Sequence, residues 1–305
     1  MTRSAESMLQ GTFTALVTPF TEDGSSVDFP ALDALVDAQL KGGVSGLVPC
    51  GTTGESPTLT DEEQAAVILR VVQRTDKRVP VFAGTGSFST KKTIAASLAA
   101  KQAGADGVMI VMPYYNKPSQ DGMKAHVLAV AGEVNLPIIL YNIPGRSVVD
   151  LAVETTAAIC NAAPNVVGMK EATGNVLRCQ ELVHRLGDRL IVLSGDDALT
   201  LPMMAVGARG VISVTSNVSP AEVSAVTTAF RAGKLEDARK AHFALLELHS
   251  LLFVEPNPTP AKTLLALLAK QGRSFPMSAS VRGPLAPATA GLAERLATYA
   301  SRSAT

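Results

Sequence analysis

The sequence contains no tryptophan, only three cysteines and only four histidines among its 305 residues. Cys50, Cys160 and Cys179 are odd in number and have no metal-type spacing, which favours buried, reduced thiols over a disulfide framework. His242 and His249 lie seven residues apart on a predicted helix, and such a pair is more typical of core or surface histidines than of a metal site. We therefore predict neither a metal ion nor an organic cofactor.

An excess of charge of either sign is also lacking. Lys and Arg number 27 and Asp and Glu number 27, so the formal net charge is +0, which argues against a nucleic-acid or membrane-surface partner. No run approaches the roughly 18 apolar residues of a membrane span, and Met1 to Gln10 carry no apolar signal region. With 47% hydrophobic residues the chain can bury a large core, and we expect a soluble, cytoplasmic protein with no nucleic acid or membrane partner.

One pattern recurs along the chain: a short β-rich apolar run ends in a cluster of Gly, Pro, Ser, Thr or Asn, and a helical stretch follows. The runs are spaced by roughly 20 to 35 residues, which leaves room for a crossover helix and predicts parallel strands. The predicted strands are Phe13 to Val17, Gly46 to Pro49, Val79 to Ala83, Gly107 to Met112, Ile138 to Tyr141, Val166 to Met169, Leu190 to Leu193 and Gly210 to Val214. These βα units predict an α/β protein with a (β/α)8 TIM barrel.

The segments between the runs carry helix signals. Thr60 and Glu63 form a capping box, and Asp28 precedes an apolar helical face. We predict a barrel over residues 1–219, and a closing helix with a small C-terminal helical appendage over residues 220–305. After the last run the chain has more helical segments than one closing helix requires: Ala221 to Ala232, Leu235 to Phe253, Ala261 to Lys270 and Ala286 to Ala300.

An open doubly wound sheet has the same alternation of strands and helices and is the structural alternative. Its dinucleotide-binding fingerprint is missing, because Gly84-Thr85-Gly86 is only half of a GxGxxG motif and Ser89 stands where the last glycine belongs. The barrel is therefore the preferred prediction.

In such a barrel, residues that follow the strands share one rim although they are far apart in the sequence. A single tyrosine there is more often a packing or interface residue, and a single arginine could be an exposed loop charge. Three of the four tyrosines together with a lysine favour a catalytic site. The residues expected at the rim are Thr52, Thr53, Tyr114, Tyr115, Tyr141, Arg146 and Lys170.

Lys170 ends an apolar run, so its amine is expected where a buried strand opens into a loop. Burial disfavours the ammonium form of a lysine, and the neutral amine can attack a carbonyl to form a Schiff base. The iminium formed from a 2-keto acid can lose a proton to give an enamine nucleophile. Tyr141, Tyr115 and Thr52 offer hydroxyl groups for these proton transfers. Arg146 could hold a carboxylate in bidentate fashion.

Five motifs in one order make the chain resemble the dihydrodipicolinate synthase and N-acetylneuraminate lyase family of pyruvate-dependent class I aldolases. The resemblance extends from about Gly11 to Lys270. The motifs are Gly51-Thr52-Thr53-Gly54-Glu55-Ser56, Pro113-Tyr114-Tyr115-Asn116, Tyr141-Asn142-Ile143-Pro144-Gly145-Arg146, Gly168-Met169-Lys170-Glu171-Ala172 and Ser194-Gly195-Asp196-Asp197.

The resemblance implies catalytic roles for matching positions. Lys170 would form the imine with pyruvate, and Tyr141 would shuttle protons. Thr52 would link Tyr141 to a Tyr115 that reaches in from a neighbouring subunit. Members of the family are typically tetramers built as pairs of tight dimers, so a homotetramer is expected.

For substrate binding, the resemblance assigns Thr53 and the backbone near Ile212 to pyruvate, and Arg146 to the carboxylate of L-aspartate 4-semialdehyde. Sialic acid lyases of the family commonly carry a serine at the position of Thr52 and lack the arginine. These details favour the synthase branch, lyases that condense the two substrates to 4-hydroxy-tetrahydrodipicolinate on the route to lysine and diaminopimelate. A related lyase, aldolase or dehydratase for another 2-keto acid or sugar acid is the alternative, and a non-catalytic keto-acid-binding barrel is a further one.

One departure from the family concerns regulation. Many lysine-inhibited synthases place polar residues in an interface pocket, where this chain has Phe88, Asp61 and Gln64. Because Phe88 cannot hydrogen-bond a lysine effector, we predict weak feedback inhibition.

Overall fold

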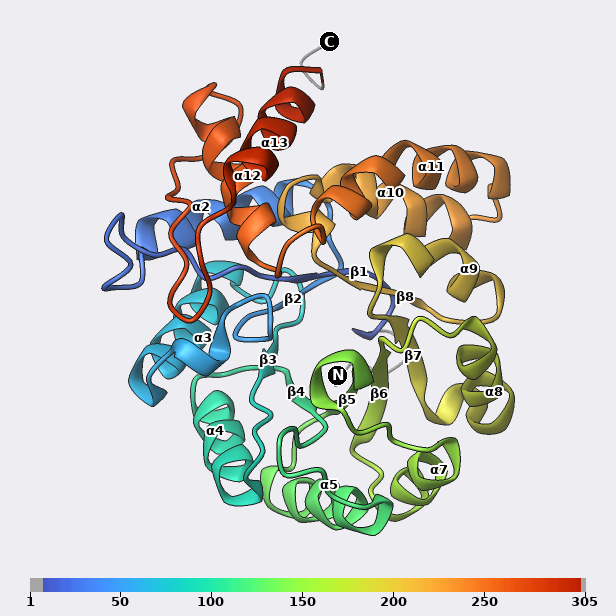
Figure 1. Cartoon of the computed structure of the whole chain (residues 1–305). Helices are drawn as coiled ribbons and strands as arrows, with labels where there is room; N and C mark the ends of the chain where they lie inside the picture. Colours follow the sequence, from blue (N-terminus) through green and yellow to red (C-terminus); the bar gives the residue numbers. More distant parts are fainter. Residues whose placement is uncertain (1–7, 303–305) are drawn as a thin grey trace.

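The computed structural model describes residues 8–302, and these residues form one eight-stranded sheet of parallel strands (Figure 1). The strands pair in the order β2-β1-β8-β7-β6-β5-β4-β3. Between the two ends of this order, Leu47 and Val81 form an isolated parallel bridge, so β2 and β3 close the barrel. The (β/α)8 prediction is confirmed and the open-sheet alternative is wrong. The strands are β1 (Gly11–Ala15), β2 (Gly46–Val48), β3 (Phe82–Gly84), β4 (Gly107–Val111), β5 (Ile138–Asn142), β6 (Val166–Glu171), β7 (Ile191–Ser194) and β8 (Gly210–Ser213).

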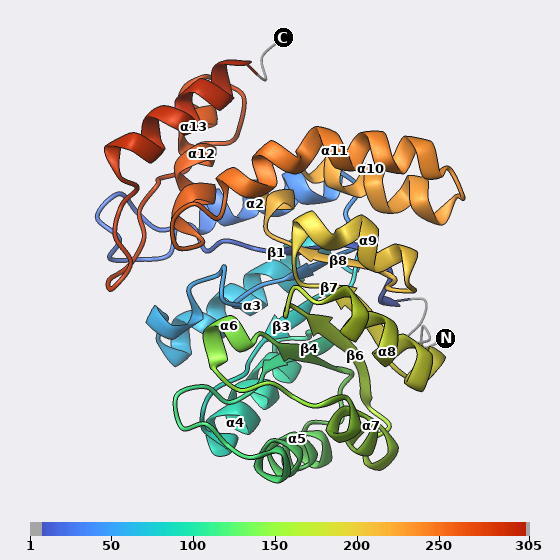
Figure 2. The same ribbon diagram turned by 45° about the vertical axis from the view of Figure 1, so that its right-hand side comes forward.

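Helices surround the barrel, and α12 and α13 lie together beyond this ring, beside α2 (Figures 1 and 2). The predicted C-terminal helical appendage is therefore present, while the division of the chain at residue 219 stays a prediction. The helices are α2 (Phe29–Lys41), α3 (Asp61–Thr75), α4 (Thr90–Gln102), α5 (Gln120–Val134), α6 (Pro144–Ser147), α7 (Val153–Ala162), α8 (Val176–Leu186), α9 (Thr200–Ala205), α10 (Pro220–Arg231), α11 (Leu235–Leu251), α12 (Thr259–Lys270) and α13 (Ala290–Arg302).

Local capping signals explain where two of these helices begin. Thr60 and Glu63 form both bonds of the predicted capping box at the start of α3. The Asp28 side chain accepts a hydrogen bond from Ala31 N at the start of α2. Each bond satisfies a backbone N–H group that has no partner inside its helix.

Each of the eight strands differs from its predicted range by at least one residue at one end or both, and three of these differences have a clear physical reason. β1 ends at Ala15, because the N–H of Val17 donates to the Asn217 side chain rather than to a strand. β3 begins only at Phe82, since Pro80 lacks the N–H that a strand interior requires. β6 continues through Lys170 to Glu171, which places the lysine inside the strand and not after it.

Large aromatic side chains fill the barrel interior. Phe13 and Phe82 are fully buried there and meet edge to face, with ring centroids 6.2 Å apart. A Cβ atom at Gly46 would lie 2.1 Å from the Phe13 ring, and one at Gly107 would lie 2.3 Å from the Phe82 ring. Glycine in β2 and β4 therefore makes room for the two rings. Tyr141 belongs to the same interior cluster.

The cysteines and the helices bear on two further expectations. Cys50, Cys160 and Cys179 are buried and free, as predicted for reduced thiols. In residues 8–302, no helix combines the length and the apolar character that a bilayer crossing needs.

Candidate active site

A cavity of about 200 Å³ lies at the carboxyl ends of β2 to β5. Thr52, Tyr114, Tyr141 and Arg146 are part of its wall, so the structure brings together four of the predicted rim residues. Glycine, serine and apolar residues form the rest of the wall. The remaining lining residues are Cys50, Gly51, Ser56, Pro57, Gly84, Gly86, Met109, Val111, Ile143 and Ser147.

Lys170 lies beside this wall, in the strand next to that of Tyr141. The two residues are register partners of β6 and β5, so their side chains project in the same direction. Lys170 is 5% exposed, and its Nζ lies 4.2 Å from the centroid of the Tyr141 ring. The barrel therefore holds a buried primary amine against a phenol that borders the cavity.

The turn after β2 is tightly folded. Cys50 and Glu55 adopt left-handed φ angles of 56° and 55°. A Cβ atom at Gly84 would lie 2.3 Å from the Cys50 carbonyl oxygen, so glycine is required where β3 passes this turn. Thr52 is exposed to the cavity, whereas Thr53 is buried and its Oγ1 accepts a hydrogen bond of 2.9 Å from the Asn257 side chain.

A buried ion pair fixes the far end of this turn. Lys262 Nζ, on α12, donates to Glu55 Oε1 over 2.5 Å, and both side chains are almost completely buried. Burial lowers the pKa of Lys262 to about 8, with Glu55 acting in the opposite direction. The backbone N–H of Arg282 donates to the other Glu55 oxygen over 2.9 Å. The C-terminal appendage thus contacts the residues that shape one side of the cavity.

Arg146 lies on the short helix α6 that follows β5, and it lines the cavity while remaining exposed. No carboxylate within residues 8–302 is in ion-pair distance of its guanidinium, in contrast to the neighbouring Arg178, which pairs with Glu171. A guanidinium without an internal partner is available to an anion that enters the cavity.

The structure does not bring Tyr115 into the cavity of its own chain. Tyr115 is 90% exposed and has a φ of 69°, whereas the preceding Tyr114 packs edge to face on Phe88 with ring centroids 5.5 Å apart. Burial raises the pKa of Tyr114. The assignment of Tyr115 to a neighbouring subunit stays a prediction.

Ile212 is the last of the predicted site residues. It lies in β8, is 1% exposed and packs in the same interior cluster as Tyr141. Its side chain belongs to the barrel core, so only its backbone remains as the substrate contact that was predicted.

The model of the Dihydrodipicolinate synthetase family matches residues 8–302 of this chain. The chain belongs to the dihydrodipicolinate synthetase family. The match covers the barrel and the C-terminal appendage alike, so both are parts of the family's common architecture.

Relatives within the dihydrodipicolinate synthetase family are similar over nearly their whole length. A 4-hydroxy-tetrahydrodipicolinate synthase of Sorangium cellulosum is 70% identical over 289 residues, which cover 95% of this chain and 94% of the relative. A 4-hydroxy-tetrahydrodipicolinate synthase of Geotalea uraniireducens is 50% identical over 280 residues, which cover 92% of this chain and 93% of the relative. The crystal structure of the dihydrodipicolinate synthase of Aquifex aeolicus is 43% identical with a TM-score of 0.92, and the similarity covers 97% of this chain and 98% of that one. The crystal structure of the dihydrodipicolinate synthase of Acinetobacter baumannii, complexed with pyruvate, is 40% identical with a TM-score of 0.91. The similarity covers 97% of this chain and 99% of that one.

Sequence reasoning missed Asn257 and Lys262, which support the turn after β2 in this member of the dihydrodipicolinate synthetase family. Their contacts join residues 204 and 207 positions apart. The Pro256-Asn257-Pro258 tract by itself indicates a rigid turn, and no local pattern marks Lys262 as buried. An amide between two prolines was the one available signal, because a polar side chain in a rigid turn is well placed to bond another segment.

Proposed function

We propose that this chain is a lyase that condenses pyruvate with L-aspartate 4-semialdehyde through a Schiff base, giving 4-hydroxy-tetrahydrodipicolinate for lysine and diaminopimelate biosynthesis. The observation that carries this function is the 70% identity, over 95% of the chain, to a relative named for that activity. The chemistry of the cavity agrees with it, because a buried amine lies against a phenol.

The reaction begins at Lys170. Its neutral amine attacks the ketone carbon of pyruvate, and loss of one water gives the imine. A proton then leaves the methyl carbon, and the resulting enamine forms the new carbon–carbon bond with the aldehyde carbon of the second substrate. The amino group of that substrate attacks the imine carbon, which closes the ring and releases Lys170. The net reaction joins the two substrates and expels one water.

Tyr141 is the residue we assign to proton transfer. The centroid of its ring lies 4.2 Å from Lys170 Nζ and the residue lines the cavity, so we assign its hydroxyl to proton exchange with the reacting carbons. Thr52 lines the same cavity and offers a second hydroxyl. Tyr115 extends the path when a second copy of the chain inserts it, which agrees with its 90% exposure here. We also propose that the enzyme is a homotetramer, a dimer of dimers, that acts in the cytoplasm.

Substrate binding follows from charge and position. Arg146 lines the cavity and has no carboxylate partner within residues 8–302, and we assign it to the carboxylate of aspartate semialdehyde. The turn that contains Thr53 and the backbone near Ile212 are assigned to pyruvate. Thr53 Oγ1 accepts the Asn257 amide, which leaves its hydroxyl hydrogen available to a carboxylate oxygen.

A coupled assay tests this function directly. Purified protein is supplied with pyruvate and aspartate semialdehyde, and dihydrodipicolinate reductase reports the product through NADPH consumption. We expect turnover in the unaltered protein, at least ~10³-fold less in Lys170→Ala, and a pyruvate adduct that borohydride traps only when Lys170 is present. Folded protein that traps pyruvate but shows no turnover with this aldehyde would instead indicate another second substrate.

A further inference from the structure

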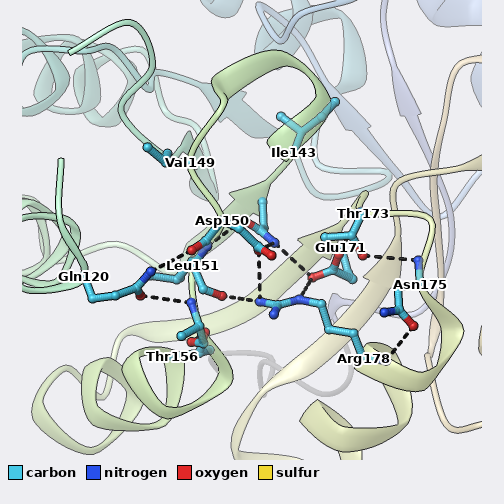
Figure 3. A network of polar contacts seen from close by, with 12 residues as sticks. Gln120, Ile143, Val149, Asp150, Leu151, Thr156, Glu171, Thr173, Asn175 and Arg178 are labelled. Atoms are coloured by element: carbon cyan, nitrogen blue, oxygen red, sulfur yellow. Dashed lines mark hydrogen bonds and ion pairs between the residues drawn. The ribbon is translucent and has the colours of Figure 1, made fainter. Parts of the chain in front are cut away.

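A network of polar residues lies behind the reacting side chains, between β5, β6 and α8 (Figure 3). Asn142 follows Tyr141 in β5, and Glu171 follows Lys170 in β6. Asn142 and Glu171 are register partners of the two strands. Since successive residues of a strand face opposite sides, they point away from the interior that holds the amine and the phenol. Both are buried, with 0% and 1% exposure.

The buried Glu171 carboxylate is held by three donors. Its Oε2 accepts from Arg178 Nε over 2.9 Å and from the Asn142 amide over 3.4 Å, and its Oε1 accepts from the backbone N–H of Thr173 over 2.8 Å. The Arg178 side chain is itself only 12% exposed. Such a site stabilises a carboxylate only while its cationic partner stays in place.

Arg178 also fastens the loop that carries Arg146. Its Nη2 group donates to the carbonyl of Leu151 and lies 3.7 Å from the Asp150 carboxylate (Figure 3). The Asn142 amide bonds the same two residues, donating to Asp150 Oδ1 over 2.8 Å and accepting from Leu151 N over 3.1 Å. The far end of the loop is thus tied to the strand from which the loop starts.

The loop between these anchors holds a conformation that its sequence does not favour. Val148 has a φ of 66°, a region that β-branched residues rarely adopt. From outside, Gln120 Nε2 donates to the Asp150 carbonyl over 2.7 Å, and its Oε1 accepts from Ala152 N over 3.0 Å. Contacts at the loop end therefore maintain the backbone that places Arg146 at the cavity.

We propose that Gln120 and Arg178, the latter with its partner Glu171, are positioning residues that hold the 143–151 loop and so set the affinity for the carboxylated aldehyde, without taking part in imine formation. This inference rests on the proposed function, in which Arg146 receives that carboxylate. The guanidinium is needed because it reaches two acceptors at once, whereas a lysine ammonium in its place reaches Glu171 or the Leu151 carbonyl but not both.

The experiment compares three variants of the full-length protein. Arg178→Lys keeps the charge beside Glu171 and loses the hydrogen bond to the Leu151 carbonyl. Gln120→Ala removes, at an exposed position, the two hydrogen bonds to the backbone of Asp150 and Ala152. Arg185→Gln is the matched control, because Arg185 lies on the same helix and its ion pair with Glu154 is exposed. For each, KM for both substrates, kcat, borohydride trapping of pyruvate and melting temperature are measured.

We expect KM for aspartate semialdehyde to rise about tenfold in Arg178→Lys and several-fold in Gln120→Ala, with kcat, KM for pyruvate and trapping within about twofold of the unaltered protein. Arg185→Gln should match the unaltered protein. A parallel loss of both substrates, or an unchanged aldehyde KM, overturns the inference, and Gln120→Ala decides it if Arg178→Lys fails to fold. An unaltered protein without turnover would instead refute the proposed function, which keeps the two failures distinct.

Discussion

At the scale of single residues, the site depends on which cations have an internal partner. Lys262 and Arg178 are each paired with a buried carboxylate, whereas Arg146 borders the cavity without a carboxylate partner among the described residues. Paired cations hold structure in place, because removing either member leaves an uncompensated buried charge. The unpaired guanidinium is available to a substrate.

Replacing Arg146 tests this distinction. Arg146→Ala should raise KM for aspartate semialdehyde by roughly 10- to 150-fold, the effect of losing about 1.5–3 kcal/mol of charge-assisted hydrogen bonding. Borohydride trapping of pyruvate should be unchanged, because Lys170 is untouched. Steady-state kinetics with each substrate varied in turn measures the split, with Arg146→Lys as the charge-preserving control. Equal loss of aldehyde binding and pyruvate trapping would sink the assignment.

At the scale of elements, the C-terminal appendage acts on the barrel through the turn after β2. Lys262 comes from α12, Asn257 from the segment before it and Arg282 from the segment after it, and all three contact that turn. Lys262 Nζ also lies 4.0 Å from the centroid of the Phe20 ring. The appendage therefore stabilises the cavity wall from outside the barrel.

The buried ion pair makes this link testable. Glu55→Gln should lower the free energy of unfolding by about 3 kcal/mol, because it leaves the Lys262 ammonium buried without a counter-charge, and adding Lys262→Met should recover most of the loss. Urea denaturation measures both. Arg74→Gln, which breaks an exposed ion pair with Asp37, is the control and should leave the free energy of unfolding nearly unchanged. A double variant as unstable as the single one would contradict the expectation.

At the scale of the whole molecule, buried histidines link the fold to pH. His126 on α5 bonds Thr90 Oγ1 on α4 over 2.9 Å, and His249 on α11 bonds Thr215 Oγ1 after β8 over 2.8 Å. Burial lowers the pKa of both imidazoles from the ordinary value of 6.5, although Asp197 opposes the shift at His249. The folded chain therefore takes up these protons at lower pH than the unfolded chain.

Stability should consequently fall on the acid side. Below about pH 6.5 the unfolded chain binds more protons than the folded chain, so the free energy of unfolding decreases as pH falls through this range. Denaturation at pH 7.5, 6.5 and 5.5 measures the slope. His126→Asn with His249→Asn should make it shallower, because asparagine keeps a donor and an acceptor without titrating, whereas the exposed His184→Asn should leave it unchanged. The same slope in the double variant as in the unaltered protein would assign the acid sensitivity to other groups.

Sequence alone was sufficient where the decisive interactions are local. The Thr60 capping box and the Asp28 cap join residues three positions apart, so a pattern of letters contains both partners. The alternation of short apolar runs with helical segments was enough for the barrel, because parallel strands need crossover helices. The motifs around Lys170 and Arg146 were enough for the family.

Only the tertiary structure decided how the site is supported. The bond from Asn257 to Thr53 and the ion pair of Lys262 with Glu55 span more than 200 residues, and no sequence spacing encodes them. β6 was predicted to end before Lys170, whereas its pairing with β5 and β7 carries the strand through it. Strand pairing and burial depend on the packing of the whole chain, and that packing is the reason a lysine at an apparent strand end becomes a buried amine beside a phenol.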